Sequence, residues 1–167
     1  MPKRRVEFRR EIYRQDVEKL ARWMADEQVS EHLNEDQNIG CELRELLDRS
    51  QLPIYSHLFN RNGCFFLVTL PSSGPIGFVR LVPGNNQAEI VVVIGERCHW
   101  NRGYGRQAIR QAARHAFFEW RKERVVATIR RENRRSKRVF KKAGFTKSEE
   151  LATESRFTLP VERFNQS

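Results

Sequence analysis

The segment AEIVVVIG, residues 88–95, places the strongest constraint on how this chain can fold. Its residues 90–94 are all isoleucine or valine, which is typical of a strand buried on both faces at the centre of a sheet. After Gly103 and Gly105, apolar residues recur on one face of a helical pattern, at positions 108, 109, 112, 113, 116 and 117. The sequence therefore predicts a central strand that leads through a short loop into a helix over 105–120.

Patterns in the rest of the chain predict the elements around this centre. The expected strands are 6–12, 64–70, 76–82, 124–130, 145–151 and 155–161, and the expected helices are 16–26 with Asp16 as N-cap, 41–50 and 133–143. A length of 167 residues fits a single domain over 1–167 with one sizeable core. The order of elements predicts an α/β sandwich built on a mixed sheet.

The positive charge is concentrated in one part of the chain. The formal net charge is +10, and residues 97–147 hold 17 Lys and Arg against three acids, an excess of 14 that leaves −4 for the rest. Such an asymmetry suggests a polyanionic partner, either a nucleotide-like cofactor or RNA or DNA. A solvated arginine-rich surface remains the alternative at this point.

Several other classes of protein are disfavoured. No apolar run approaches the length that crosses a bilayer, and the basic N-terminus lacks the apolar stretch of a signal peptide, so we expect no membrane partner. Cys41, Cys64 and Cys98 are odd in number and widely spaced, which argues against disulfides or a zinc site. We therefore expect a cytoplasmic protein without a metal.

The loop before the predicted helix has the chemistry of an anion site. The first backbone N–H groups of a helix have no partners within it and carry the positive end of the dipole, and glycines let an anion approach. Arg97, Arg102 and Arg106 add charge-assisted contacts, so the loop suits a pyrophosphate. It is not a Walker loop or a dinucleotide GxGxxG, because no GKS or GKT follows and position 108 is alanine.

Two linked motifs extend this interpretation. RGYGRQAIRQAARHAF after AEIVVVIG, followed by NRRSKRVFKKAGF, resembles the GNAT superfamily of acetyl-CoA-dependent N-acetyltransferases over roughly residues 76–150. The pattern DVEKLARWMAD resembles the branch with ribosomal-protein N-terminal and polyamine acetyltransferases. The resemblance implies a GNAT-type sandwich, with a mostly antiparallel mixed sheet, splayed fourth and fifth strands at 88–95 and 124–130, and helices on both faces.

The resemblance also implies where acetyl-CoA binds. Backbone amides near Val93 and Ile94 would pair with pantetheine, Asn133 would contact the same arm, and Phe140 takes the place of a tyrosine that many members hold near the thiolate. Trp100 stands where the family pattern has Arg or Gln, which puts one side-chain contact in doubt. The pyrophosphate would lie on the segment from Arg102 to Arg106, that is Arg102, Gly103, Tyr104, Gly105 and Arg106, with Arg97 nearby.

Acetylation of an amine needs a base for the amine and a proton for the departing thiolate. Glu89, at the start of the fourth strand, resembles the general base of the histone-acetyltransferase branch, and Glu96 is the other candidate. Because Phe140 cannot donate a proton, Ser136 or water would serve the thiolate. The acidic segment SEHLNEDQ, residues 30–37, lies where the family has its substrate loop and is a candidate for attracting a cationic amine.

Three functions therefore stay open. The first is direct transfer of acetyl from acetyl-CoA to a polyamine, a peptide N-terminus or another small amine. The second is a GNAT-like protein that binds acyl-CoA without turnover, for which Phe140 is the reason. The third is a basic nucleic-acid-binding module, which accounts for the charge but not for the glycines or the motif from Asn133 onward, so nucleic acid is the less favoured partner. Assembly into a homodimer also stays open.

Overall fold

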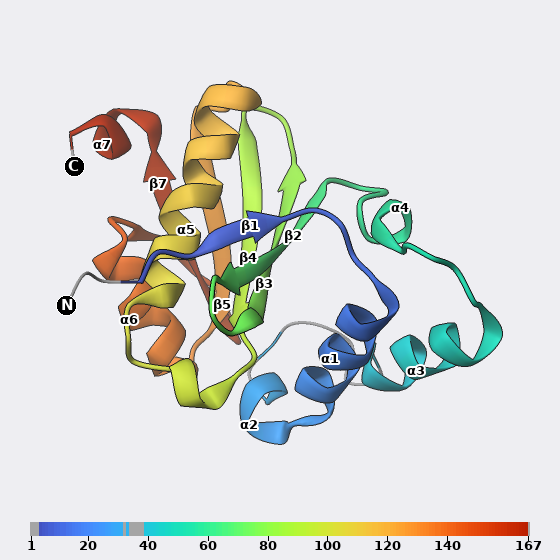
Figure 1. The fold of residues 1–167 in the computed structure, drawn as a ribbon. Helices are drawn as coiled ribbons and strands as arrows, with labels where there is room; N and C mark the ends of the chain where they lie inside the picture. Colours follow the sequence, from blue (N-terminus) through green and yellow to red (C-terminus); the bar gives the residue numbers. More distant parts are fainter. Residues whose placement is uncertain (1–3, 32, 34–38, 167) are drawn as a thin grey trace.

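The computed structural model describes residues 4–31, 33 and 39–166. Within them, a seven-stranded sheet has the strand order β1-β2-β3-β4-β5-β7-β6 (Figure 1). The strands are β1 (Glu7–Arg9), β2 (Cys64–Leu70), β3 (Gly74–Pro83), β4 (Gln87–Ile94), β5 (Arg124–Arg130), β6 (Thr146–Glu150) and β7 (Glu154–Pro160). The helices are α1 (Arg14–Ala25), α2 (Glu27–Ser30), α3 (Ile39–Arg49), α4 (Ser56–Phe59), α5 (Tyr104–Arg114), α6 (Arg134–Lys142) and α7 (Val161–Asn165).

The sheet is antiparallel except where β4 meets β5. This parallel pairing covers Gln87 to Glu89 of β4 and Arg124 to Val126 of β5, and it stops there. Because both strands continue after the pairing ends, they separate toward their carboxyl ends. The predicted splay of the fourth and fifth strands is confirmed.

Two hydrophobic clusters lie on opposite faces of the sheet. One contains Ile90 of β4 and the apolar face of α5, including Ala108 and Ala112. The other contains Val93 of β4 and residues such as Leu20 of α1. β4 therefore contributes to both cores, as its continuous apolar run predicts, and helices cover both faces of the sheet (Figure 1).

Several local features differ from the sequence prediction, among them α2 and α4, which were not predicted. Asp16 is not the N-cap of α1 but lies in its first turn, where its carboxylate accepts the N–H of Tyr13 at 2.9 Å and pairs with Arg9 at 2.8 Å. The strand β1 covers Glu7–Arg9 and is shorter than the predicted strand 6–12. The helix predicted over 105–120 changes after Arg114 into a π-helical segment, His115–Glu119. The short α7, which follows Pro160, was not predicted.

No helix in the described part of the chain is long and apolar enough to cross a membrane.

Candidate functional site

The start of α5 depends on a glycine in the left-handed region. Gly103 is its N-cap with φ 85° and ψ 4°, and a Cβ added there would meet nothing within 4 Å, so the backbone conformation rather than space favours glycine. The first helical bond in this turn is from Gln107 N–H to the Gly103 carbonyl, at 3.1 Å. The amides of Tyr104, Gly105 and Arg106 therefore have no carbonyl partner within α5, which is the arrangement that binds anions.

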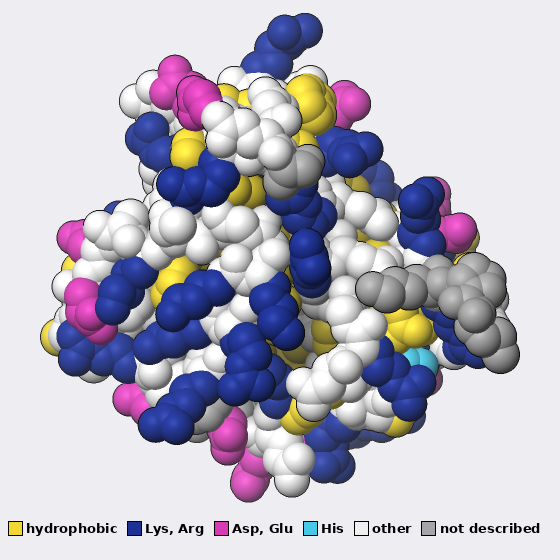
Figure 2. All heavy atoms as spheres, turned by 90° about the vertical axis from the view of Figure 1, so that its left-hand side faces the viewer, with side chains coloured by type: hydrophobic (Ala, Val, Ile, Leu, Met, Phe, Trp, Pro, Cys, Tyr) yellow, Lys and Arg dark blue, Asp and Glu magenta, His cyan; other side chains and the backbone are white. Residues whose placement is uncertain are grey.

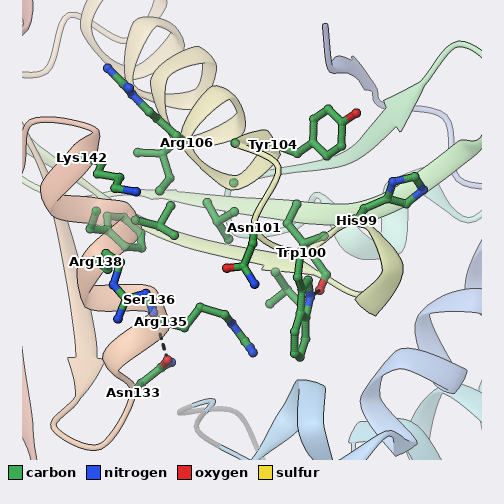
Figure 3. A pocket seen from close by; sticks show the side chains of 18 of the residues that line it. His99, Trp100, Asn101, Tyr104, Arg106, Asn133, Arg135, Ser136, Arg138 and Lys142 are labelled. Atoms are coloured by element: carbon green, nitrogen blue, oxygen red, sulfur yellow. Dashed lines mark hydrogen bonds between the residues drawn. The ribbon is translucent and has the colours of Figure 1, made fainter. Parts of the chain in front are cut away.

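The helix α6 stands close beside this turn. A Cβ on Gly105 would lie 3.3 Å from Cγ1 of Val139, so the second glycine of the loop also serves the packing of α5 on α6. Asn133 caps α6: its Oδ1 accepts the N–H of Ser136 at 3.1 Å (Figure 3). This bond uses the carbonyl oxygen of the Asn133 side chain and leaves its Nδ2 group for a ligand.

A cavity of about 320 Å³ lies between the end of β4, the first turn of α5 and α6. Most of the predicted cofactor residues meet there, namely Val93, Ile94, Gly103, Tyr104, Gly105, Arg106, Asn133 and Phe140, together with Ser136. The side chains of Val93, Tyr104 and Phe140 are buried. The structure thus brings the two sequence motifs together around one hollow.

Three cations that were not among the predicted site residues also line this cavity. Arg135, Arg138 and Lys142 project from α6 and join Arg106 of α5 (Figure 3). Their spacing of three and then four residues places them on one side of a helix. This spacing of cations is present in the predicted helix 133–143, but the motif that begins at Asn133 predicted only Asn133, Ser136 and Phe140 as site residues.

Trp100 closes one side of the cavity and is tied to both neighbouring elements. Its indole N–H donates to the Ile94 carbonyl at 2.7 Å, at the end of β4. The guanidinium carbon of Arg135 lies 3.5 Å from the centroid of the Trp100 ring (Figure 3). Burial lowers the pKa of Arg135, while the charge of Glu31 acts in the opposite direction. At the motif position where Arg or Gln was expected, the structure therefore has an aromatic ring with an arginine from α6 against it.

A second cavity, of about 210 Å³, opens where β4 and β5 separate. Glu89 lines this cavity and not the first one, and its side chain is exposed. Arg80 and Thr128 also line it. The two cavities share five lining residues, which are Leu33, Val92, Asn133, Ser136 and Phe140. They are therefore adjacent hollows.

Other predicted residues lie outside both cavities. Arg97 pairs with Asp26 at 2.9 Å and donates to Gln28 at 2.8 Å, which fixes the loop to α2. Arg102 is exposed and lines neither cavity. Glu96 accepts the indole N–H of Trp23 at 3.0 Å. Most of the predicted acceptor segment 30–37 lies outside the described residues.

No group of three or more His, Cys, Asp and Glu side chains arranged to hold a metal occurs among residues 4–31, 33 and 39–166.

Comparison with known families shows the family of the chain. The family model for an acetyltransferase (GNAT) domain matches residues 5–146. The chain belongs to the GNAT acetyltransferase family. A search of curated proteins finds no match.

Solved structures agree in fold. A GNAT-family acetyltransferase from Bacillus anthracis has a TM-score of 0.76 at 20% identity, covering 95% of this chain and 96% of its own. Spermidine N-acetyltransferase from Vibrio cholerae, in complex with CoA and spermine, has a TM-score of 0.75 at 18% identity, covering 96% and 98%. Aminoglycoside acetyltransferase AAC(6')-Ib, in complex with coenzyme A, has a TM-score of 0.77 at 16% identity, covering 97% and 98%. At these identities the likeness establishes the GNAT fold.

Proposed function

We propose that this chain is an acetyl-CoA-dependent N-acetyltransferase that transfers the acetyl group directly to a primary amine in a ternary complex. The observation that carries the proposal is the meeting of two cavities at the point where β4 and β5 separate. One is lined by helix-start amides and cations, and the other contains a carboxylate. Membership of an acetyltransferase family and structural relatives that hold CoA support the same assignment.

The groups of the larger cavity fit CoA. The free amides of Tyr104, Gly105 and Arg106 suit the pyrophosphate. Arg138 and Lys142 lie within the same hollow and add positive charge. Beyond Glu89, β4 has no pairing with β5, while its other edge stays paired with β3. Successive residues of a strand direct their backbone groups to opposite edges, so in the segment of Val93 and Ile94 the amides on the β5 side are available to the amide groups of pantetheine.

The smaller cavity fits the acceptor amine. Acetyl-CoA supplies the thioester, and the amine nitrogen forms a bond to its carbonyl carbon as the carbon–sulfur bond breaks. In this proposal Glu89 takes the proton of the ammonium group, directly or through water, so that a neutral amine attacks. After the attack the nitrogen gives up its second proton, and this proton passes through the Ser136 hydroxyl, which borders both cavities, or through water to the departing thiolate.

Phe140 supports a second candidate, a protein that binds acyl-CoA without turnover. Its ring borders both cavities and is buried, 4% exposed. Phenylalanine has no proton to give, so a site that relied on this position for the thiolate would be inactive. The two candidates differ in turnover and agree in cofactor binding.

One experiment separates these functions. The protein is incubated with acetyl-CoA and a panel of polyamines, peptides with free N-termini and aminoglycosides, and thiol release is measured with acetyl-CoA hydrolysis as the baseline. Thermal stabilisation by CoA is measured in parallel. Amine-dependent thiol release supports the enzyme, stabilisation without release across the panel supports the binding protein, and absence of stabilisation contradicts both.

A further inference from the structure

The cations of α6 fall into two sets, and only one of them lines the cofactor cavity. Arg135, Arg138 and Lys142 line it, whereas Arg134, Lys137 and Lys141 do not. Each set follows the spacing i, i+3, i+7, so the sets form adjacent stripes on the helix. The second stripe has no part in the proposed reaction.

The helix α5 adds a second cationic row beside this stripe. Arg110, Arg114 and Phe118 follow Arg106 at intervals of four residues. Arg110 donates to the Ala143 carbonyl at 3.1 Å, at the carboxyl end of α6. From the other side, Arg163 of α7 donates to the hydroxyl of Thr146 at 2.9 Å, just beyond α6.

These elements together form one surface, which we call the distal basic face. Figure 2, which looks at the side of the molecule with α6 and α7, shows Lys and Arg side chains across its centre and acidic side chains mostly toward its margins. We define the face by residues of α5, the π-helical segment, α6 and α7, which hydrogen bonds and ring contacts link to one another: Arg110, Arg114, Phe118, Arg134, Lys137, Lys141 and Arg163.

Four of the six cations of this face are not neutralised within the described part of the chain. None of Arg114, Arg134, Lys137 and Lys141 takes part in an ion pair there. The acids on the following strand are engaged elsewhere, because Glu149 pairs with Arg156 and Glu150 with Arg131 and Lys147. Burial, and then the charges of Arg106 and Arg114, lower the pKa of Arg110, as expected in a field of like charges.

CoA does not account for these cations. Its pyrophosphate and 3′-phosphate carry about four negative charges, since a phosphomonoester alone carries about 1.5–2. The cavity already presents four cations to them, Arg106, Arg135, Arg138 and Lys142. The distal basic face therefore has charge left for a second polyanion.

We propose that the distal basic face binds the phosphate backbone of a nucleic acid, in addition to the acetyl transfer proposed above. Arginine and lysine in stripes suit successive phosphates. Phe118, which is 56% exposed, lies against Phe164, and the guanidinium of Arg110 lies 4.4 Å from the centroid of that ring. An exposed ring beside cations is what a stacked base requires.

An anionic membrane fits this face less well. Membrane-surface binding needs several apolar side chains that enter the lipid. The exposed large hydrophobic residues of the described chain are Tyr13, Leu52, Ile54 and Phe118, and only Phe118 belongs to the face.

The test compares two double charge reversals that change the net charge equally. Arg134→Glu/Lys141→Glu alters the distal basic face outside the cavity, and Arg44→Glu/Arg61→Glu alters exposed residues elsewhere. Binding to a 20-nucleotide RNA and to DNA of the same sequence is measured from low to physiological salt, and thermal stabilisation by CoA is measured on every sample.

We expect the unmodified chain to bind with a steep salt dependence. The Arg134→Glu/Lys141→Glu variant should bind at least about tenfold more weakly, with a salt slope smaller by about 2, because two phosphate contacts are lost. The Arg44→Glu/Arg61→Glu variant should stay within about twofold of the unmodified chain. Phe118→Ala should weaken binding while leaving the salt slope unchanged, because stacking releases no counterions. Comparison of the affinities for RNA and DNA identifies the nucleic acid that the face prefers.

Three outcomes would overturn the proposal. These are no binding of RNA or DNA even at low salt, equal weakening by the two double variants, or tighter binding to phosphatidylserine vesicles than to either nucleic acid. CoA-dependent stabilisation is expected in all the variants. Its presence or absence reports on the cofactor site and so separates failure of this inference from failure of the proposed acetyltransferase function.

Discussion

The guanidinium carbon of Arg135 lies 3.5 Å from the centroid of the Trp100 ring, and the Trp100 indole N–H is bonded to the end of β4 at the Ile94 carbonyl. The pair thus links α6 to the central strand along the edge of the larger cavity. The guanidinium of Arg135 lies at the cavity with the charge of Glu31 acting on it, and its N–H groups are donors that an anionic ligand in the cavity would use.

The first prediction concerns this pair. Arg135→Met should raise the dissociation constant of CoA about 5- to 10-fold. Trp100→Ala should have a similar effect, because the arginine then loses the ring on which it stacks. Such a cation–π contact contributes about 1–2 kcal/mol when it is partly desolvated. Arg134→Met, one residue earlier and outside the cavity, is the matched control. Isothermal titration with CoA measures all three, and equal losses in Arg135→Met and Arg134→Met would refute a specific role for the pair.

The second prediction tests the left-handed turn before α5. Gly103→Ala should lower the free energy of unfolding by about 1–2 kcal/mol, because φ is +85° there, and should also weaken CoA binding as the first helical amides shift. Gly74→Ala is the matched control, since Gly74 has φ +69° and equal space for a Cβ but is the first residue of β3 and does not line the cavity. We expect similar destabilisation in denaturant titrations and a loss of CoA affinity in Gly103→Ala alone.

Much of the fold could be predicted because its central pattern has few solutions. A run of β-branched residues such as 90–94 is stable only between two hydrophobic layers, and β4 does contribute Ile90 to one core and Val93 to the other. The helix after Gly103 could be predicted for the same reason, because its apolar face had to cover that strand. Short elements without a hydrophobic periodicity, such as α7, could not be predicted in this way.

The cavity was predictable in its backbone and less so in its side chains. Glycines and helix starts mark where amides are free, and Gly103 was predicted from such a local signal, whereas Asn133 was predicted from the resemblance to the GNAT superfamily. The partner of Trp100 depends on a contact between residues 35 positions apart, which no local pattern contains. Arg97 shows the opposite case, because its position beside the loop suggested an anion contact, whereas the fold places Asp26 within 2.9 Å of it.

The third prediction assigns the base. Glu89→Gln should lower kcat for the best acceptor amine by about 10²-fold near neutral pH. The loss should shrink at high pH, where the amine is already neutral. Glu96→Gln is the control, because Trp23 holds this carboxylate outside both cavities, and it should lower stability while leaving the pH–rate profile unchanged. A Glu89→Gln enzyme with the unmodified profile would exclude Glu89 as the base.

The fourth prediction concerns acid stability through His115. Its imidazole packs edge-on against Phe66 and Trp120, and burial, then the charge of Arg10, lowers its pKa below 6.5, with Glu119 acting in the opposite direction. The unfolded chain therefore binds this proton more readily than the folded chain. The contribution of the neutral His115 to the free energy of unfolding should be fully present above about pH 6.5. The free energy of unfolding should fall as the pH decreases through that value.

Substitution isolates this contribution. His115→Gln should make stability depend less on pH between 7 and 5, as measured by urea unfolding at each pH. His57→Gln, at an exposed position on α4, should retain the slope of the unmodified chain. Identical slopes for His115→Gln and the unmodified protein would mean that other groups cause the acid sensitivity.

The fifth prediction distinguishes an active enzyme from an inactive binder at Phe140. The ring lies edge-on to Phe145 at 5.0 Å and borders both cavities, so the hydroxyl of a Phe140→Tyr variant can reach a polar environment and need not be buried without a partner. If the thiolate leaves near this ring, Phe140→Tyr should keep CoA affinity within about twofold and leave kcat unchanged or raised.

Phe145→Tyr is the control, because that ring is 2% exposed and lines neither cavity, so its hydroxyl should cost stability without helping turnover. Thermal melts show whether each variant is folded, and a folded Phe140→Tyr protein that no longer binds CoA or releases thiol would show that the thioester lies elsewhere.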